Sequence, residues 1–158
     1  MNLFILYVMS ITMGSALVIA SPAFKNNELI PSKYTCDGLN INPKLTIEEI
    51  PENAKSLVII MDDPDAPGGT YCHWVIWDIP PRGSIEEGSA PGIQGKNSMR
   101  ENKYFGPCPP SGIHHYHFKV YVLNAKLGLP PTTGKNELEK AMKTHILSSG
   151  ELVGLYRR

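Results

Sequence analysis

The sequence predicts a single, mainly β domain with one helix near its C-terminal end. Gly and Pro number 14 each in 158 residues, and this composition favours a turn-rich β protein over a helical bundle. Two strongly apolar runs of strand length, 56–61 and 73–79, are bounded by Pro and Gly. A third segment, 113–123, alternates along its length as a long strand does. A chain of this size can build one compact domain with a real core.

The first 20 residues differ from the rest. Residues 3–20 carry no charge, and their length fits a signal peptide or a short membrane helix. Val18-x-Ala20 and Ser21-x-Ala23 are both acceptable cleavage patterns. We therefore expect a cleaved signal peptide over 1–20, a domain over 21–158, and an exported protein that is periplasmic or secreted. The alternative is a membrane anchor formed by an uncleaved N-terminal segment, because the n-region before the apolar run carries no Lys or Arg.

Short strands, turns and one long loop are predicted between the export sequence and the strand at 113–123. Residues 44–47 alternate like a half-buried strand, and 50–54 form a turn that leads into the run at 56–61. The run at 73–79 is stopped by 80–83, which contains two prolines and a glycine. Residues 84–110 are rich in Gly, Ser, Asn, Pro and charge, and a loop of this length is usually functional or poorly ordered.

The segment 113–123 is the longest strand candidate, and its alternation separates two faces. One face is predicted to be a core stripe that starts with two polar side chains, and it presents His114, Tyr116, Phe118, Val120 and Val122. The opposite face starts with cationic side chains and is expected to be solvated at that end; it presents His115, His117, Lys119, Tyr121 and Leu123.

The helix is expected to follow Asn136, which can serve as its N-cap, with Glu139 completing a capping box. Apolar residues at i, i+3 and i+4 from Leu138 onward form a stripe that would pack on the sheet. Gly150 is the expected stop after the helix, and 151–156 is expected to return as a final strand.

The charges of the chain balance, with 15 Lys and Arg against 15 Asp and Glu. This argues against a nucleic-acid-binding tract, so no nucleic-acid partner is expected, although a local charged pocket remains compatible with it.

Three carboxylates lie between the two apolar runs, in Asp62-Asp63-Pro64-Asp65. Each of them could cap backbone N–H groups in a tight Asx turn. That interpretation does not easily explain all three, because charge beside hydrophobic strands is costly unless something pairs with it. A pocket at the strand ends is the simplest account.

Two histidines each open a strand, His73 and His114. A single histidine on an apolar face is more often a satisfied core side chain than a ligand-binding one. If the strands are neighbours, however, both rings, Tyr116 and Asp63 could converge on one small polar cavity. Such a cavity could hold a phosphate-sized anion without any clustered Lys or Arg. Before the second strand, the segment 106–112 contains two glycines and three prolines and predicts a rigid connector or pocket rim.

The motifs Asp63-Pro64-Asp65-Ala66-Pro67, with the following His73, and 106–116 (GPCPPSGIHHY) resemble the phosphatidylethanolamine-binding protein family. The chain is most similar to the bacterial YbhB/YbcL branch, also called Raf-kinase-inhibitor-like, from about residue 21 to the end. The resemblance implies a β-sandwich-like fold, with a large antiparallel sheet packed with a smaller sheet and few helices. It also implies a pocket for phosphate, acetate or a phospholipid headgroup, bound by residues that correspond here to Asp63, His73, His114 and Tyr116.

Other motif residues are expected at the rim of this pocket, namely Asp65, Pro67, Gly106, Pro109, Pro110 and His115. His115 replaces the arginine usual in the family, so a group that titrates near neutrality replaces a permanent cation. An exported protein with three cysteines invites a disulfide, and we predict Cys36–Cys108 with Cys72 free.

Three kinds of function fit these observations. The leading hypothesis is a small exported binding protein for an anionic ligand, possessing no enzymatic activity, cofactor or metal. The alternative is inhibition of a kinase or serine peptidase, with 84–110 as the contact surface. Catalysis is the third, either by an acid–base pair of Asp63 and His73 or by zinc bound to these two residues and His114. No Gly-x-Ser-x-Gly or His-Glu-x-x-His motif supports it.

Overall fold

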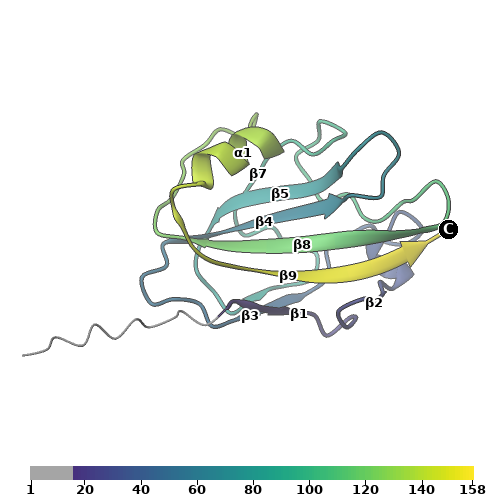
Figure 1. Cartoon of the computed structure of the whole chain (residues 1–158), viewed down its shortest axis with the longest axis horizontal. Coiled ribbons are helices and arrows are strands. Elements are labelled where there is room, and N and C mark those ends of the chain that lie inside the picture. Colours follow the sequence, from purple (N-terminus) through teal and green to yellow (C-terminus); the bar gives the residue numbers. More distant parts are fainter. Residues whose placement is uncertain (1–15) are drawn as a thin grey trace, which may run out of the picture.

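The computed structural model describes residues 16–158, which form two β-sheets and one α-helix (Figure 1). Within these residues, the large sheet has six strands in the order β2-β9-β8-β4-β5-β7 and the small sheet has the order β1-β3-β6. The large-sheet strands are β2 (Glu28–Leu29), β9 (Ile146–Arg157), β8 (Ile113–Leu123), β4 (Ser56–Asp63), β5 (Tyr71–Ile79) and β7 (Ile93–Gln94). The others are β1 (Val18–Ala20), β3 (Leu45–Glu48) and β6 (Ser84–Ile85), and the helices are α1 (Lys135–Met142) and a short 3₁₀ turn, Ser32–Tyr34. The predicted fold class is confirmed.

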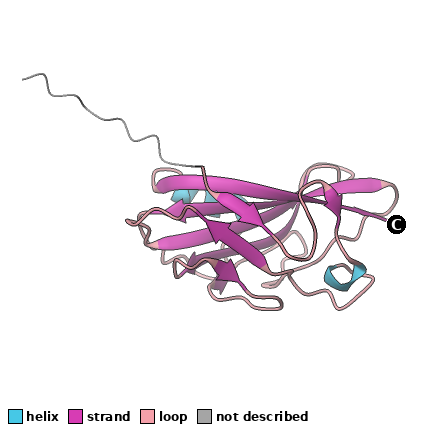
Figure 2. Cartoon of the chain, turned by 90° about the horizontal axis from the view of Figure 1, so that it is seen from below, coloured by secondary structure: helices cyan, strands magenta, loops and turns pink. Residues whose placement is uncertain are grey.

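The two apolar runs form the central strands β4 and β5, which pair antiparallel with each other and are buried on both faces. Alternate side chains of β4 serve different cores. Leu57, Ile59 and Met61 pack on the side of the small sheet, which we call the front face. Val58 and Ile60 pack on the back face together with α1. The layers can be followed in Figure 2.

The strand predicted at 113–123 is β8, with the same bounds, and it lies between β4 and β9. The predicted core stripe, from His114 to Val122, is buried. On the opposite face His115 is exposed and His117 and Lys119 are half-buried, as the alternation predicts.

The helix packs on the sheet as predicted, with Leu138 and Met142 buried, but its predicted ends are wrong. The N-cap is Gly134 rather than Asn136, and its N–H donates to the Glu137 carboxylate at 2.7 Å. Glu139 takes no part in the cap.

Gly150 does not end the helix; it lies inside β9, which begins at Ile146 rather than at 151. A Cβ on Gly150 would lie 2.3 Å from the carbonyl oxygen of Leu17. The glycine is therefore explained by the close approach of the N-terminal segment to β9.

The segment 84–110 is organised by backbone pairing and by an asparagine. It contains β6 and β7, and the side-chain oxygen Oδ1 of Asn97 accepts hydrogen bonds from the N–H groups of Met99 and Glu101 at 2.9 and 3.0 Å. Its final residues return to the large sheet, where the Phe105 N–H donates to the His73 carbonyl at 3.1 Å. This return brings the loop against the start of β5.

The N-terminal strand β1 is part of the small sheet and pairs antiparallel with β3. Leu17 and Ile19 are buried, whereas Val18 on the other face is exposed. Residues 1–15 of the expected signal peptide lie outside the described residues. The expected boundary after Ala20 would separate this strand from the domain, and the cleavage itself stays a prediction.

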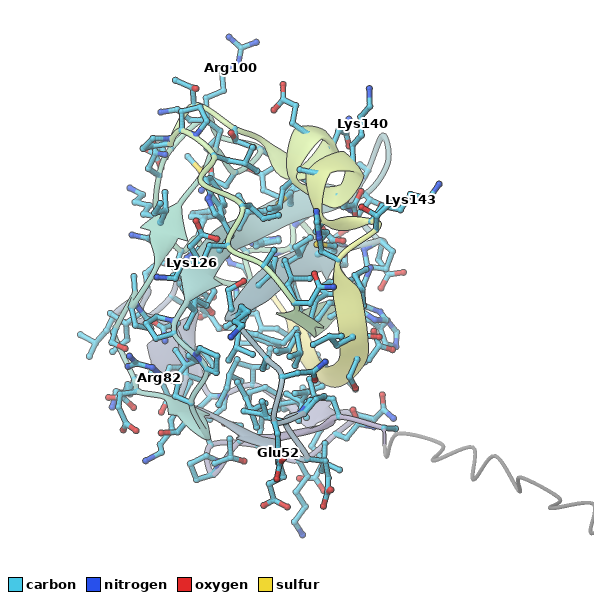
Figure 3. All side chains as sticks on the ribbon, turned by 90° about the vertical axis from the view of Figure 1, so that its left-hand side faces the viewer. Glu52, Arg82, Arg100, Lys126, Lys140 and Lys143 are labelled. Atoms are coloured by element: carbon cyan, nitrogen blue, oxygen red, sulfur yellow. A yellow bond between two sulfur atoms is a disulfide. The ribbon has the colours of Figure 1, made fainter. Side chains whose placement is uncertain are left out.

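No helix among residues 16–158 has the length and apolar character needed to cross a membrane. Charged side chains point outward around the domain, as Arg82, Lys126, Lys140 and Lys143 do in Figure 3.

Candidate functional site

A cavity of about 380 Å³ opens on the front face, where β4 ends and β5 and β8 begin. This end of the sheet is on the right of Figure 1. The cavity is lined by Asp63, Ala66, Pro67, Tyr71, His73, Phe105, Cys108, Pro109, Pro110 and His114. The structure thus brings both predicted histidines and the predicted carboxylate into one pocket, which we call the front pocket.

A β-bulge in β5 places His73 on the pocket side. Met61 of β4 is paired with Trp74 and the next residue, Asp62, with Cys72, so His73 is the extra residue. Cys72 therefore faces the back core while Trp74 packs in the front core, and His73 is available to the pocket. Bulges of this kind commonly re-aim side chains next to functional sites.

The His73 ring is held by a backbone carbonyl and by aromatic neighbours. Its Nδ1 lies 2.7 Å from the Phe105 carbonyl oxygen, so this nitrogen carries the proton and donates it, leaving Nε2 for a ligand. The ring stacks on Phe105 at 5.7 Å between centroids and contacts Tyr71 at 4.9 Å. Burial lowers the pKa of His73 below its usual 6.5, because the charged form loses its hydration.

His114 is paired with Asp63. The Asp63 Oδ2 accepts a hydrogen bond from His114 Nδ1 at 2.7 Å, and both side chains are buried. The other oxygen, Oδ1, accepts from the Asp65 N–H at 2.9 Å in an Asx turn. The carboxylate therefore shapes the loop and orients the imidazole at the same time, and Nε2 is the His114 nitrogen left for a ligand.

Tyr116 supports the two imidazoles from beneath the pocket but does not line it. The Tyr116 ring contacts the His73 ring edge-on, with 5.2 Å between the ring centroids. The distance from its centroid to that of the His114 ring is 6.5 Å. The hydroxyl is buried without a hydrogen-bond partner within residues 16–158. Burial raises the pKa of the Tyr116 phenol, so the hydroxyl is protonated and uncharged. It can donate or accept a hydrogen bond but carries no negative charge.

Of the predicted rim residues, Pro67, Pro109 and Pro110 line the front pocket. Asp65 and His115 do not line it; they form a pair outside the cavity. The Asp65 Oδ2 accepts from both the backbone N–H and the Nδ1 of His115, at 2.8 and 2.7 Å. These two bonds hold the pKa of Asp65 below its usual value.

The substitution Asp65→Asn is expected to lower the free energy of unfolding by less than about 1 kcal/mol at pH 7, since the pair is partly exposed. A carboxyl with a lowered folded-state pKa contributes its stability above the unfolded pKa and loses it as the pH falls through the folded pKa. The difference between the two proteins should therefore shrink as the pH falls from about 5 to about 2. Urea unfolding at several pH values measures it, and a gap that persists at low pH would contradict the charge explanation.

Gly106 also lies outside the cavity wall, where it joins two loops. Its N–H donates to the Asn40 side-chain carbonyl at 2.7 Å, and a Cβ there would lie 2.3 Å from the Tyr34 carbonyl oxygen. A glycine is therefore required at this close approach.

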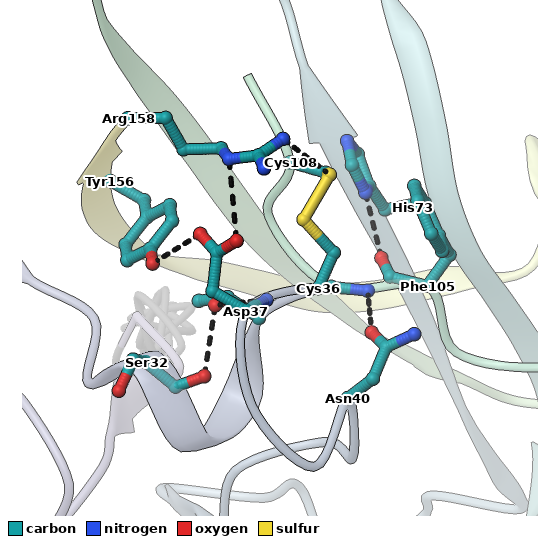
Figure 4. Close-up of a disulfide and its surroundings, with 11 residues drawn as sticks. Ser32, Cys36, Asp37, Asn40, His73, Phe105, Cys108, Tyr156 and Arg158 are labelled. Atoms are coloured by element: carbon teal, nitrogen blue, oxygen red, sulfur yellow. Dashed lines mark hydrogen bonds and ion pairs between the residues drawn. A yellow bond between two sulfur atoms is a disulfide. The ribbon is translucent and has the colours of Figure 1, made fainter. Parts of the chain in front are cut away.

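The predicted disulfide is present (Figure 4). Cys36 and Cys108 are bridged, and Cys72 is a buried free thiol. The Cys36 N–H also donates to the Pro107 carbonyl at 3.1 Å, so the bridge fixes the loop that supplies Cys108 to the front pocket. Asp37, beside the bridge, accepts bonds from the Tyr156 hydroxyl and pairs with Arg158, which ties the end of the chain to the same loop.

Sequence reasoning missed three pocket residues, Tyr71, Phe105 and Ala66. Tyr71 had a usable signal, because it lies two residues before His73 and a strand repeats every two residues. Phe105 had none, since it reaches the pocket by the path of a long loop, where its carbonyl and its ring both contact His73.

The three acidic residues of the loop, Asp62, Asp63 and Asp65, have three different sets of contacts. Asp63 and Asp65 have the roles given above, whereas Asp62 faces the back of the sheet and binds Lys135 at 2.6 Å and Lys119 at 3.2 Å. Within the described residues, no group of three or more His, Cys, Asp or Glu side chains is arranged to hold a metal ion.

Comparison with known proteins gives one consistent family. A family model described as phosphatidylethanolamine-binding protein matches residues 20–157. A UPF0098 protein of Pyrococcus abyssi is 54% identical over 156 residues, covering 92% of this chain and 88% of its own length.

Two solved structures share the fold. A phosphatidylethanolamine-binding protein homologue of Chlamydia trachomatis, CT736, has a TM-score of 0.87 and 37% identity, covering 90% of this chain and 98% of its own. YbcL of Escherichia coli, described as a member of the mammalian family of these proteins, has a TM-score of 0.84 and 25% identity, covering 91% and 99%.

Proposed function

The chain belongs to the phosphatidylethanolamine-binding protein family, and from this premise we propose that its front pocket binds a small oxyanion of the phosphate or phospho-headgroup class. One observation carries the proposal: His73 and His114 line the same cavity, and each has its Nδ1 engaged by the protein. Two Nε2 atoms are thus available to a ligand in a wall that is otherwise largely aromatic and prolyl.

The two imidazoles complement a singly protonated oxyanion. His73 is neutral at pH 7 because burial lowers its pKa, so its Nε2 accepts a hydrogen bond. His114 donates from Nδ1 to the Asp63 carboxylate at 2.7 Å, and only the imidazolium form of the ring would also donate from Nε2. Hydrogen phosphate or a phosphomonoester supplies an O–H for the first ring and an oxygen for the second.

The substitution His114→Gln is expected to weaken phosphate binding by between about tenfold and a hundredfold, the loss of one charge-assisted hydrogen bond of roughly 1.5–3 kcal/mol. Isothermal titration calorimetry with inorganic phosphate at pH 7 measures this. His145→Gln is the matched control, because His145 lies beyond α1 and binds Asn124 rather than the pocket. Equal affinities for the native protein and His114→Gln would remove the basis for this site.

We further propose that the protein binds its ligand without transforming it and that it acts outside the cytoplasm. Cys72, the free thiol beside His73 in sequence, faces the back core, and burial raises its pKa to about 12. It is therefore protonated, turned away from the histidine, and unsuited to nucleophilic attack. The disulfide supports export, since such bonds persist in oxidising compartments.

A further inference from the structure

Strand β1 builds the first described residues into the fold. Its three residues pair antiparallel with β3, beside which it lies (Figure 1). Leu17, directly before the strand, and Ile19 within it are both buried in the front core. The residue after the strand is fixed as well, since the Ser21 hydroxyl donates to the Lys44 carbonyl at 2.6 Å. Residues 17–21 are therefore an integral part of the domain.

Gly150 of β9 matches the presence of Leu17. The Leu17 carbonyl oxygen would lie 2.3 Å from a Cβ at position 150, which is too close for any residue other than glycine. A glycine inside a strand weakens it, because it has no side chain to pack and loses more conformational freedom on folding. This glycine is accounted for in a protein whose functional form keeps Leu17.

A signal peptide cut after Ala20 would remove this part of the fold. The remaining chain would lack the buried side chains of Leu17 and Ile19, and one edge of β3 would lose its neighbour in the sheet. A cut after Ala23 would also remove the Ser21 contact. Both of these patterns therefore yield an incomplete domain.

A third cleavage pattern ends just before the strand. Gly14 and Ala16 place small residues at the −3 and −1 positions of the bond that follows Ala16, as is typical of signal-peptide cleavage sites. At the bond that follows Ala20, the −3 position is Val18, which is larger and β-branched. The uncharged stretch before the third pattern, residues 3–13, is 11 residues long, within the usual range of about 7–15 for the apolar region of a signal peptide.

We propose that the protein is processed on export between Ala16 and Leu17, so that the mature chain begins with the residues that form β1. A signal peptidase would hydrolyse this peptide bond with one water molecule, leaving a carboxylate on Ala16 and an amino group on Leu17. Ala16 is exposed and lies outside the strand, whereas Leu17 is buried. The bond between them is thus the point at which the export sequence meets the folded domain. This inference rests on the export proposed above and is independent of the ligand of the front pocket.

The test is expression of the full chain in a bacterium that has a signal peptidase, followed by cell fractionation and N-terminal sequencing of the exported protein. We expect the exported chain to begin at Leu17 and its intact mass to correspond to residues 17–158. A start at Ser21 or Phe24 would overturn the proposal. An exported chain that keeps Met1 would overturn it too, because the N-terminal segment would then be an uncleaved anchor.

Two matched variants test the bond directly. Ala16 and Ala20 are both exposed, so a valine at either position should leave the fold intact. Ala16→Val places a branched side chain at −1 and should abolish the product that begins at Leu17. Ala20→Val, four positions further on, should be processed as the native chain is. Normal processing of Ala16→Val, or loss of processing in Ala20→Val alone, would contradict the proposed bond.

Failure of this inference is distinguishable from failure of the proposed ligand binding. A native chain found entirely in the cytoplasmic fraction would contradict export and the processing site together. Titration of the purified protein with inorganic phosphate tests the front pocket in either case, whichever N-terminus is found.

Discussion

Removing the Cys36–Cys108 bridge should lower the free energy of unfolding by about 4 kcal/mol, the chain-entropy estimate for a loop of this size. The two cysteines are separated by 72 positions, so the cross-link restricts nearly half of the chain in the unfolded state. For a domain whose total stability is of the order of 5–15 kcal/mol, this is a large fraction. We expect the double variant Cys36→Ala/Cys108→Ala to fold but to unfold at clearly lower urea concentration.

Urea unfolding of four samples separates the cross-link from the side chains: the native protein and the double variant, each with and without reductant. Reductant should destabilise the native protein to about the level of the double variant and leave the variant unchanged. The buried thiol of Cys72, present in all samples, controls for reductant effects elsewhere. A double variant as stable as the oxidised native protein would show that the bridge contributes little.

The bridge also links stability to the front pocket. Cys108 lines the cavity together with Pro109 and Pro110, and Cys36 holds the facing loop. The Arg158 guanidinium contacts the Cys108 sulfur at 3.6 Å and pairs with Asp37, so the C-terminal residue braces the same loop. These contacts keep the rim in place, and Asp63 is the carboxylate among the residues that line the cavity.

The central strands and the core stripe of β8 could be predicted because their signals are local. Uninterrupted apolar runs predict strands that are buried on both faces. Alternation of apolar and polar residues with a period of two assigns the two faces of 113–123. The meeting of His73 and His114 was predicted from their positions at strand starts, together with the family resemblance. β5 and β8 both flank β4, which brings the two strand starts to one end of the sheet.

The features that could not be predicted depend on tertiary contacts. Gly150 has the appearance of a helix stop in sequence, yet it is set by the Leu17 carbonyl, more than 100 positions away. The β-bulge at His73 exists only as a register shift against β4, and the Phe105 carbonyl acts through the path of a loop. Asp62 and Asp63 are adjacent identical residues, and only the strand that contains them assigns one to each face.

Removal of residues 16–20 should destabilise the domain by at least about 2 kcal/mol, the lower end of the cost of deleting one buried Leu or Ile side chain. Leu17 and Ile19 are 5% and 8% exposed and pack in the front core, and β1 covers one edge of β3. Comparing a chain that starts at Ala16 with one that starts at Ser21, by urea unfolding, measures the effect. It also bears on export, because cleavage after Ala20 would yield the shorter chain.

The two faces of β1 supply a matched pair of variants for the same strand. Ile19→Ala should lower stability by about 2 kcal/mol or more, since it leaves a cavity between the sheets. Val18 is the preceding residue and lies on the exposed face of β1. Val18→Ala should therefore change the free energy of unfolding by less than about 0.5 kcal/mol. The expectation fails if the chain that starts at Ser21 is as stable as the longer one and Ile19→Ala is neutral. In that case β1 is dispensable, and a mature N-terminus at residue 21 does not destabilise the fold. If both lower stability as expected, a secreted form cut after Ala20 would have to function without its edge strand, and N-terminal sequencing of exported protein shows which form is made.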